Sequence, residues 1–320
     1  RRGLRFIGPV ASSQQAIVSR EGENQKSKIE FLTLAPNPQH PAPALVGREA
    51  ELAQLHRWLD KSLAGERHIV FVTGEPGIGK TTLVESFLYG LASREQEESQ
   101  KAKRKSQSAK VSEAQSSALS PQSLPFPNLR PLTPVPWIAR GQCIEHFGAG
   151  EAYLPVLEAL GRLCREPEHE RLIEVLYQHA PTWLVQMPAL LNSTELEALQ
   201  RKVLGATRER MLREMAEALE VLTAERGLVL WFEDLHWSDY STLDLISSLA
   251  RRLEKVRLLV IGTYRPVDLI VREHPLKVIK EELQLHNHCQ ELALELLNET
   301  AIAEYLTARF QVPSPFQGEG

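Results

Sequence analysis

Apolar and polar positions divide the chain between residues 45 and 310 into short apolar runs and longer segments of helical spacing. The apolar runs at 68–73, 228–232 and 257–263 predict strands, of which the β-branched run 68–73 reads as buried. Short strands are also expected at 137–143 and 290–294. Apolar residues at helical spacing predict helices that follow residues 49 and 82, and others at 153–165, 168–179, 194–203, 206–225, 241–253, 275–284 and 298–310. Strands that alternate with helices favour an α/β fold, a three-layer sandwich with a mainly parallel sheet covered on both faces.

Polar stretches of low complexity set the expected domain boundaries. Residues 11–44 are rich in Ser, Gln, Glu and Lys and then in Pro, which predicts a linker because such a composition buries too little apolar surface to fold. A second stretch of this kind, 92–134, predicts a disordered insertion within a core that spans 45–266. Residues 267–311 are expected to begin a helical region, and 312–320 to form a disordered tail because they show no periodicity.

Composition narrows the class of protein. A chain of 320 residues, 42% of them hydrophobic, can hold one large α/β domain with flanking segments. Its net charge of −4 argues against a protein that coats nucleic acid through a basic surface. Three separated cysteines suit a reducing cytoplasm, and no apolar stretch approaches the ~18–20 residues of a membrane span. We therefore expect a cytoplasmic protein without a membrane partner, and a chain that begins with Arg1 predicts a fragment of a longer one.

The segment after the first predicted strand carries the clearest chemical signal. It reads Gly74-Glu75-Pro76-Gly77-Ile78-Gly79-Lys80-Thr81-Thr82 and contains the pattern G-x-x-x-x-G-K-[ST] of a phosphate-binding loop, or P-loop. Glycines let the backbone bend tightly and direct several N–H groups at one anion, and the start of the following helix also favours negative charge. We expect Lys80 to reach the β- and γ-phosphates and the Thr81 hydroxyl to coordinate Mg²⁺. The nine residues are predicted to bind a nucleoside triphosphate.

Two adjacent carboxylates, Glu233 and Asp234, end the third predicted strand. Hydrolysis of a bound triphosphate needs Mg²⁺ opposite the loop and a carboxylate near the attacking water. The ends of neighbouring parallel strands meet in the crevice where such sheets bind ligands, so this pair is placed to supply both. Aligned to the pattern hhhh[DE][DE], Glu233 takes the metal side and Asp234 the water side. The reverse assignment stays open, because Asp usually stands at the first place, so both remain candidate metal ligands and catalytic residues.

Arg265 follows the fourth predicted strand and is expected at the same edge of the sheet. The planar guanidinium matches phosphate oxygens, so this arginine is predicted to sense the γ-phosphate. A surface arginine before Pro266 is the alternative interpretation.

Several motifs occur together in one order along the chain, at 46–49, 74–82, 140–143, 150–155, 233–239 and 262–265. This set resembles the AAA-type ATPase module of the signal-transduction ATPases with numerous domains, especially those in bacterial multidomain regulators, over about residues 45–310. The resemblance implies a P-loop NTPase fold with the start of a helical lid, in which Val46, Gly47 and Arg48 lie against the adenine. It also implies ATP or ADP as the bound nucleotide, Mg²⁺ as the metal, and a conformational switch that can self-associate on nucleotide binding.

Residues 1–10 read Arg-Arg-Gly-Leu-Arg-Phe-Ile-Gly-Pro-Val and resemble the last hairpin of the winged-helix domain of response-regulator-type transcription factors. The resemblance implies that the helix that reads DNA would lie upstream, so DNA would be a partner only through a domain missing here. A basic leader is the alternative for this short segment.

The resulting functional hypothesis is a regulatory ATPase: a slowly hydrolysing signalling switch within a bacterial transcriptional regulator. A transcription-factor fragment with vestigial nucleotide binding and a truncated, non-functional product are alternatives from other classes. A P-loop small-molecule kinase fits less well, because the segment 233–237 is not expected in one.

Overall fold

The protein is described here by a computed structural model, which covers residues 45–93, 135–145, 151–166 and 170–310. The predicted winged-helix remnant, the linker, nearly all of the insertion and the predicted tail lie outside these described residues. The helix that follows the P-loop is described over residues 80–93, with Leu91 and Ala92 buried. The insertion that composition placed from residue 92 therefore overlaps the last described turn of this helix.

Five strands form one sheet in the order β2-β3-β4-β1-β5, and every neighbouring pair is parallel. Their bounds are β1 His68–Thr73, β2 Trp137–Gln142, β3 Leu228–Glu233, β4 Leu258–Tyr264 and β5 Gln290–Ala293. The predicted three-layer α/β sandwich is confirmed. Because all strands run the same way, their carboxyl ends share one edge: Gln142 pairs with Glu233, and Thr73 pairs with Tyr264.

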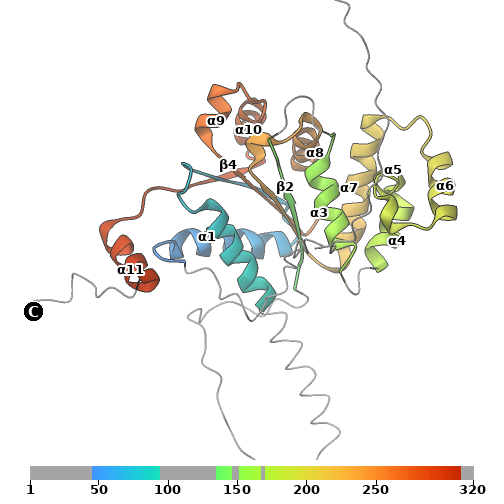
Figure 1. The fold of residues 1–320 in the computed structure, drawn as a ribbon. Coiled ribbons are helices and arrows are strands. Elements are labelled where there is room, and N and C mark those ends of the chain that lie inside the picture. The colour runs from blue at the N-terminus through green and yellow to red at the C-terminus, as the bar shows by residue number, and fades with distance from the viewer. Residues whose placement is uncertain (1–44, 94–134, 146–150, 167–169, 311–320) are drawn as a thin grey trace, which may run out of the picture. The chain divides into compact units, whose positions relative to one another are not determined.

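Two apolar cores cover the two faces of this sheet (Figure 1). Along β1, Ile69 and Phe71 belong to one core and Val70 and Val72 to the other, because successive side chains of a strand point to opposite faces. The smaller core is completed by α1 (Glu49–Leu63) and the helix over 80–93. Burial on both faces explains why β1, β3 and β4 read as continuous apolar runs rather than alternating ones. The edge strand β5 has no buried residue.

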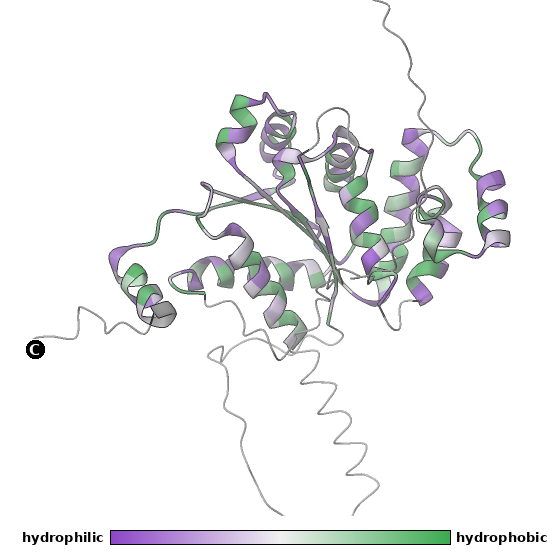
Figure 2. Ribbon diagram, viewed as in Figure 1, coloured by the Kyte–Doolittle hydropathy of each residue, from purple (hydrophilic) through white to green (hydrophobic). Residues whose placement is uncertain are grey.

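The larger core is formed by helices from the rest of the chain, some of which pack on the sheet and others on neighbouring helices. Figure 2 shows that these helices carry both hydrophobic and hydrophilic residues. Their bounds are α3 Leu154–Leu163, α4 Glu170–His179, α5 Pro181–Leu184, α6 Ser193–Lys202, α7 Arg208–Glu225, α8 Tyr240–Arg251, α9 Pro266–Val271 and α10 Leu276–Leu285. Two short 3₁₀ turns, η1 Pro188–Leu190 and η2 Leu235–Trp237, and a last helix, α11 Glu299–Phe310, complete the described elements. Each helix predicted by a residue range lies within about two residues of its observed bounds.

The short helices α5 and α9 were not predicted. Each begins with a proline, Pro181 or Pro266, at its first position, where the missing N–H costs no hydrogen bond. Four and six residues are too few to show helical spacing. The omission of α9 matters most, because this helix starts directly after Arg265.

One close approach fixes β2 against α3. A Cβ added to Gly141 would lie 1.9 Å from the carbonyl oxygen of Pro155, so only glycine fits between the strand and the first turn of the helix. This contact sets the position of Arg140 and Gln142, which flank Gly141 at the end of the strand. Among the described residues, no helix is both long and apolar enough to cross a membrane.

Candidate functional site

The P-loop connects β1 with the helix over residues 80–93 and lies at the carboxyl edge of the sheet. Gly74, Gly77 and Gly79 all have positive φ angles, of 152°, 77° and 98°. These are backbone conformations that side chains with a Cβ rarely adopt. Residues 75–77 are exposed, whereas residues 78, 79, 81 and 82 are half-buried. The loop therefore presents its backbone to solvent at the place predicted for phosphate.

Lys80 is buried, with 6% of its surface exposed. Its ammonium group donates hydrogen bonds to the carbonyl oxygens of Gly74, at 2.9 Å, and Glu75, at 2.8 Å. Burial lowers the pKa of Lys80, and the nearby guanidinium of Arg265 lowers it further. A cation that is removed from water in this way gains strongly from an anion placed beside it.

Glu233 joins the P-loop to the neighbouring strands. The hydroxyl of Thr81 donates to Oε1 of Glu233 at 2.8 Å, and Nη2 of Arg140 donates to Oε2 at 2.5 Å. Arg140 also bonds Glu85 at 3.2 Å and lies over the ring of Trp231, 4.2 Å from its centroid. The hydroxyl and the carboxylate predicted to share a metal ion are thus side by side, although 152 positions separate them in sequence.

Asp234 turns away from Glu233, because its backbone is in the left-handed region, with φ 56°. Its N–H donates to the hydroxyl of Thr263 on β4 at 3.0 Å, which stabilises this conformation. Burial raises the pKa of the Asp234 carboxyl, with Arg265 opposing and Glu233 adding to the effect. Two carboxylates that are adjacent in sequence therefore face different surroundings.

His236 lies on η2, the turn that directly follows Asp234, and its side chain is completely buried. Its Nδ1 is 3.9 Å from Oδ1 of Asp234, and its Nε2 is 3.3 Å from Oδ2 of Asp268 on α9. Burial lowers the pKa of His236 to about 4, so the imidazole is neutral at pH 7.

Arg265 caps the start of α9 at the same edge of the sheet. Its Nη1 lies 3.9 Å from Oδ2 of Asp268, and its charge affects the pKa values of both Lys80 and Asp234. The structure therefore brings Arg265 near the P-loop and the acid pair, as its position in sequence predicts, with its guanidinium directed to its own helix.

The segment 46–48 lies beside the P-loop through Arg48. The guanidinium of Arg48 is buried and donates to the carbonyl oxygens of Glu295, at 2.5 Å, and Ile78, at 3.4 Å. Gly47 faces α11: an added Cβ would lie 2.5 Å from the Cβ of Ala301. Val46 is half-buried. The predicted adenine segment is thus in contact both with the loop and with the helix that follows β5.

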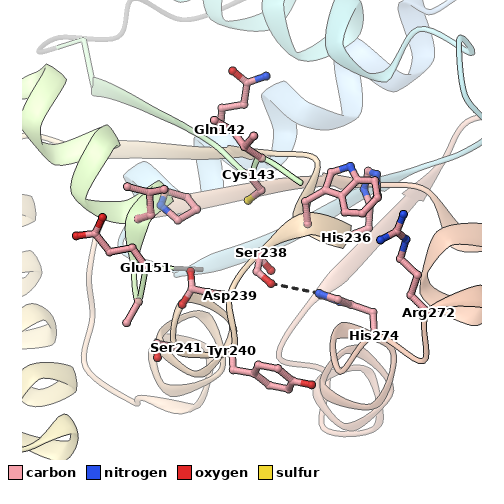
Figure 3. A pocket seen from close by; sticks show the side chains of 15 residues that line it. Gln142, Cys143, Glu151, His236, Ser238, Asp239, Tyr240, Ser241, Arg272 and His274 are labelled. Carbon is pink, nitrogen blue, oxygen red and sulfur yellow. Dashed lines mark hydrogen bonds between the residues drawn. The ribbon is translucent and has the colours of Figure 1, made fainter. Parts of the chain in front are cut away.

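A cavity of about 410 Å³ lies at the ends of β2 and β3 and is lined in part by η2, including His236 (Figure 3). Its lining includes Cys143, Trp237 and His274, and Arg272 lies over the Trp237 ring at 3.8 Å from the centroid. Burial raises the pKa of the Cys143 thiol far above its ordinary value, so this cysteine is not a reactive thiolate.

Taken together, the described residues fit a magnesium-bound nucleotide. The loop supplies glycines with positive φ angles and a desolvated cation at Lys80, and Thr81 with Glu233 forms a hydroxyl-carboxylate pair of the kind Mg²⁺ accepts. Sequence reasoning did not assign roles to Arg140, Thr263 or His236. A charged residue inside a strand was the one available signal for Arg140. The role of Thr263 depends on a contact with the neighbouring strand, and that of His236 on a contact with α9.

The glycine loop, the parallel sheet and the acid pair at its edge define a P-loop nucleotide-binding α/β protein. The family model described as "AAA ATPase domain" matches residues 44–261. This match covers more than half of the chain, and the chain belongs to that family.

Two further comparisons report similar proteins. "Uncharacterized protein R02095" of Rhizobium meliloti (strain 1021) is 28% identical over 226 residues, which make up 69% of this chain and 18% of that protein. The chain thus spans about a fifth of the length of this relative. A solved structure, that of the Aeropyrum pernix ORC1 protein in complex with DNA, aligns with 87% of this chain and 52% of its own, with 14% identity and a TM-score of 0.39.

Proposed function

We propose that this chain is an ATP-dependent signalling switch, which binds ATP with Mg²⁺ and hydrolyses it slowly. The observation that carries the proposal is the 2.8 Å contact between the Thr81 hydroxyl and Glu233. It brings the phosphate-binding segment and the acid pair into one site, as hydrolysis of a nucleoside triphosphate requires.

The proposed roles follow from the position of each side chain. The backbone of residues 74–79 and the ammonium of Lys80 would bind the phosphates. Thr81 and Glu233 would hold Mg²⁺, and Thr82 continues the helix that begins at Lys80. When bound, Mg²⁺ would supply positive charge that stabilises the negative charge of the phosphates. Asp234 orients the attacking water and accepts its proton, as its partly desolvated carboxyl allows. Val46, Gly47 and Arg48 lie against the adenine.

Existing contacts support a switch with slow turnover. Lys80 is bonded to its own loop, and both oxygens of Glu233 are engaged, one by Thr81 and one by Arg140. These bonds must rearrange before the same groups can hold phosphate and metal. Because Arg48 ties the loop to the segment before α11, such a rearrangement would reach the end of the described chain and shift the population between two forms.

The wider context is proposed on sequence grounds. Residues 1–10 end a winged-helix domain, 11–44 form a linker, 45–266 the ATPase core with the insertion 92–134, 267–311 the start of a lid, and 312–320 a tail. The chain would then belong to a cytoplasmic bacterial transcriptional regulator that reaches DNA through its winged-helix domain and self-associates on binding nucleotide. The much greater length of the Rhizobium meliloti relative is compatible with this arrangement.

Thermal unfolding with increasing ATP and Mg²⁺ tests the core of the proposal. The wild-type midpoint should rise with nucleotide, because a ligand that binds only the folded state stabilises it, by about 2.7 kcal/mol at a hundred times Kd. Lys80→Ala should abolish this rise, while Lys202→Ala, at an exposed lysine on α6, should leave it unchanged. A rise that survives in Lys80→Ala contradicts the assigned site. Binding without any turnover favours the alternative of a transcription-factor fragment with vestigial nucleotide binding.

A further inference from the structure

His236 is a buried titratable side chain to which the proposed mechanism gives no role. None of its side-chain surface is exposed, and neither ring nitrogen makes a hydrogen bond within the described residues. Both nitrogens nevertheless face carboxylates from different elements: Asp234 at the end of β3 and Asp268 on α9. Core packing alone does not require a buried ring whose two nitrogens each face a carboxylate.

The carboxylate of Asp268 also lies 3.9 Å from the guanidinium of Arg265. A continuous series of contacts therefore runs from Asp234 through His236 and Asp268 to Arg265. Its two ends are the side chains proposed to meet the attacking water and the γ-phosphate.

The turn η2 and the segment that begins with α9 meet at two further points. Arg272, the C-cap of α9, lies over the ring of Trp237, and Nε2 of His274 lies 3.3 Å from the carbonyl oxygen of Ser238 (Figure 3). The turn that carries Asp234 is thus bracketed by the segment 265–274, with the imidazole between them. A displacement of α9 would be transmitted to this turn.

We propose that His236 is a positioning residue that fixes the Asp234 carboxylate relative to α9 and Arg265, so that the water-side acid is aligned only when the γ-phosphate sensor is in place. This inference rests on the proposed function. Imidazole suits the task because its two nitrogens lie on opposite sides of one rigid ring. Asparagine supplies a polar atom near the position of Nδ1 alone, and glutamine supplies one near the position of Nε2 alone. Leucine supplies neither.

The test is steady-state ATP turnover of the full chain with Mg²⁺, for wild type and for His236→Asn, His236→Gln and His236→Leu. We expect His236→Leu to lower kcat about 10-fold or more, because small misplacements of a catalytic group are costly, while KM for ATP changes less than about 2-fold. His236→Asn should recover part of the loss, since it restores a polar atom next to Asp234. His286→Asn and His286→Leu, at an exposed histidine after α10, serve as matched controls and should behave as wild type.

The outcomes separate this inference from the proposed function. A wild-type chain without turnover overturns both. An active wild type with an unchanged kcat in His236→Leu, or with equal losses of kcat and ATP affinity in all three variants, overturns the inference alone. Should His236→Leu fail to fold, the Asn and Gln variants decide: kcat equal to wild type in both contradicts the positioning role, and a lower kcat in His236→Gln than in His236→Asn supports it.

Discussion

The P-loop and the acid side of the site, which comprises Glu233, Asp234, Arg265 and their contacts, are built in different ways. The loop is one continuous segment, 74–82, whose glycine conformations and helix start are local properties. The acid side draws on β2, β3, β4 and α9, and its contacts join residues such as Thr81 and Glu233 that are 152 positions apart. A local motif can be recognised from its residue types and their spacing, whereas a site assembled across strands depends on the order and register of those strands.

The largest expected effect separates the two acids of the acid side. Asp234→Asn should lower kcat about 10²- to 10³-fold with ATP binding retained, because an amide cannot accept the proton of the attacking water. Glu233→Gln should raise the Mg²⁺ concentration needed for turnover. Mg²⁺ titrations of ATPase activity measure both, with Asp60→Asn at an exposed position of α1 as control. If Asp234→Asn shifts the Mg²⁺ requirement instead, the two roles are exchanged.

The next effect tests whether the acid side depends on strand position. Gly141→Ala should lower the free energy of unfolding by about 1–3 kcal/mol, because the new methyl group collides with the backbone of Pro155. It should also disturb Arg140 and hence turnover. Gly161→Ala on α3 is the matched control, since its Cβ would meet only Sδ of Met187 at 3.6 Å. Urea unfolding compares the two, and equal stabilities would show that β2 and α3 can separate without cost.

A smaller effect tests the local character of the P-loop. Gly79→Ala should cost about 1–2 kcal/mol, since its φ of 98° disfavours any residue with a Cβ. Gly90→Ala, in the helix that follows, has open space around its added Cβ and should stabilise by about 0.5–1 kcal/mol. Thermal unfolding without nucleotide measures the pair, and a neutral Gly79→Ala would mean that the loop tolerates other conformations.

The last effect concerns pH and distinguishes the buried acid side from the exposed loop. Burial lowers the pKa of His236 to about 4, whereas an unfolded histidine titrates near about 6.5. Between these values the unfolded chain binds the extra proton, so the free energy of unfolding falls as the pH drops below about 6.5, by at most about 1.4 kcal/mol per pH unit for one proton. Urea unfolding at pH 7, 6 and 5 should show a shallower fall in His236→Leu. An identical slope in both proteins would contradict the neutral state of this histidine.

Sequence patterns predicted most of the fold because burial leaves a local pattern of apolar residues in most elements. The strands β1, β3 and β4 are buried on two faces and therefore stand out as apolar runs, and the longer helices carry clear apolar stripes. The helices α5 and α9 were missed because a few residues that start with proline show no periodicity. The missing α9 concealed Asp268, and with it the surroundings of Arg265 and His236.

The candidate site divides in the same manner. The residue types and their spacing alone pointed to the P-loop and the acid pair. The position of Arg265 directly after a predicted strand placed it at the carboxyl edge of the sheet, where the structure has it. Neither signal assigned a role to Arg140, because its partner Glu233 lies on another strand, or to Thr263, whose hydroxyl accepts the N–H of Asp234.

The sequence by itself determined that the chain has a P-loop, a mainly parallel α/β core and acids at a strand end, because these follow from residue types at short spacing. Only the tertiary structure decided which strand lies beside which, and hence that Glu233 meets both Thr81 and Arg140 while the N–H of Asp234 meets the hydroxyl of Thr263. The physical reason is that these contacts are set by the order and register of parallel strands. Both depend on packing across the whole sheet rather than on any local segment.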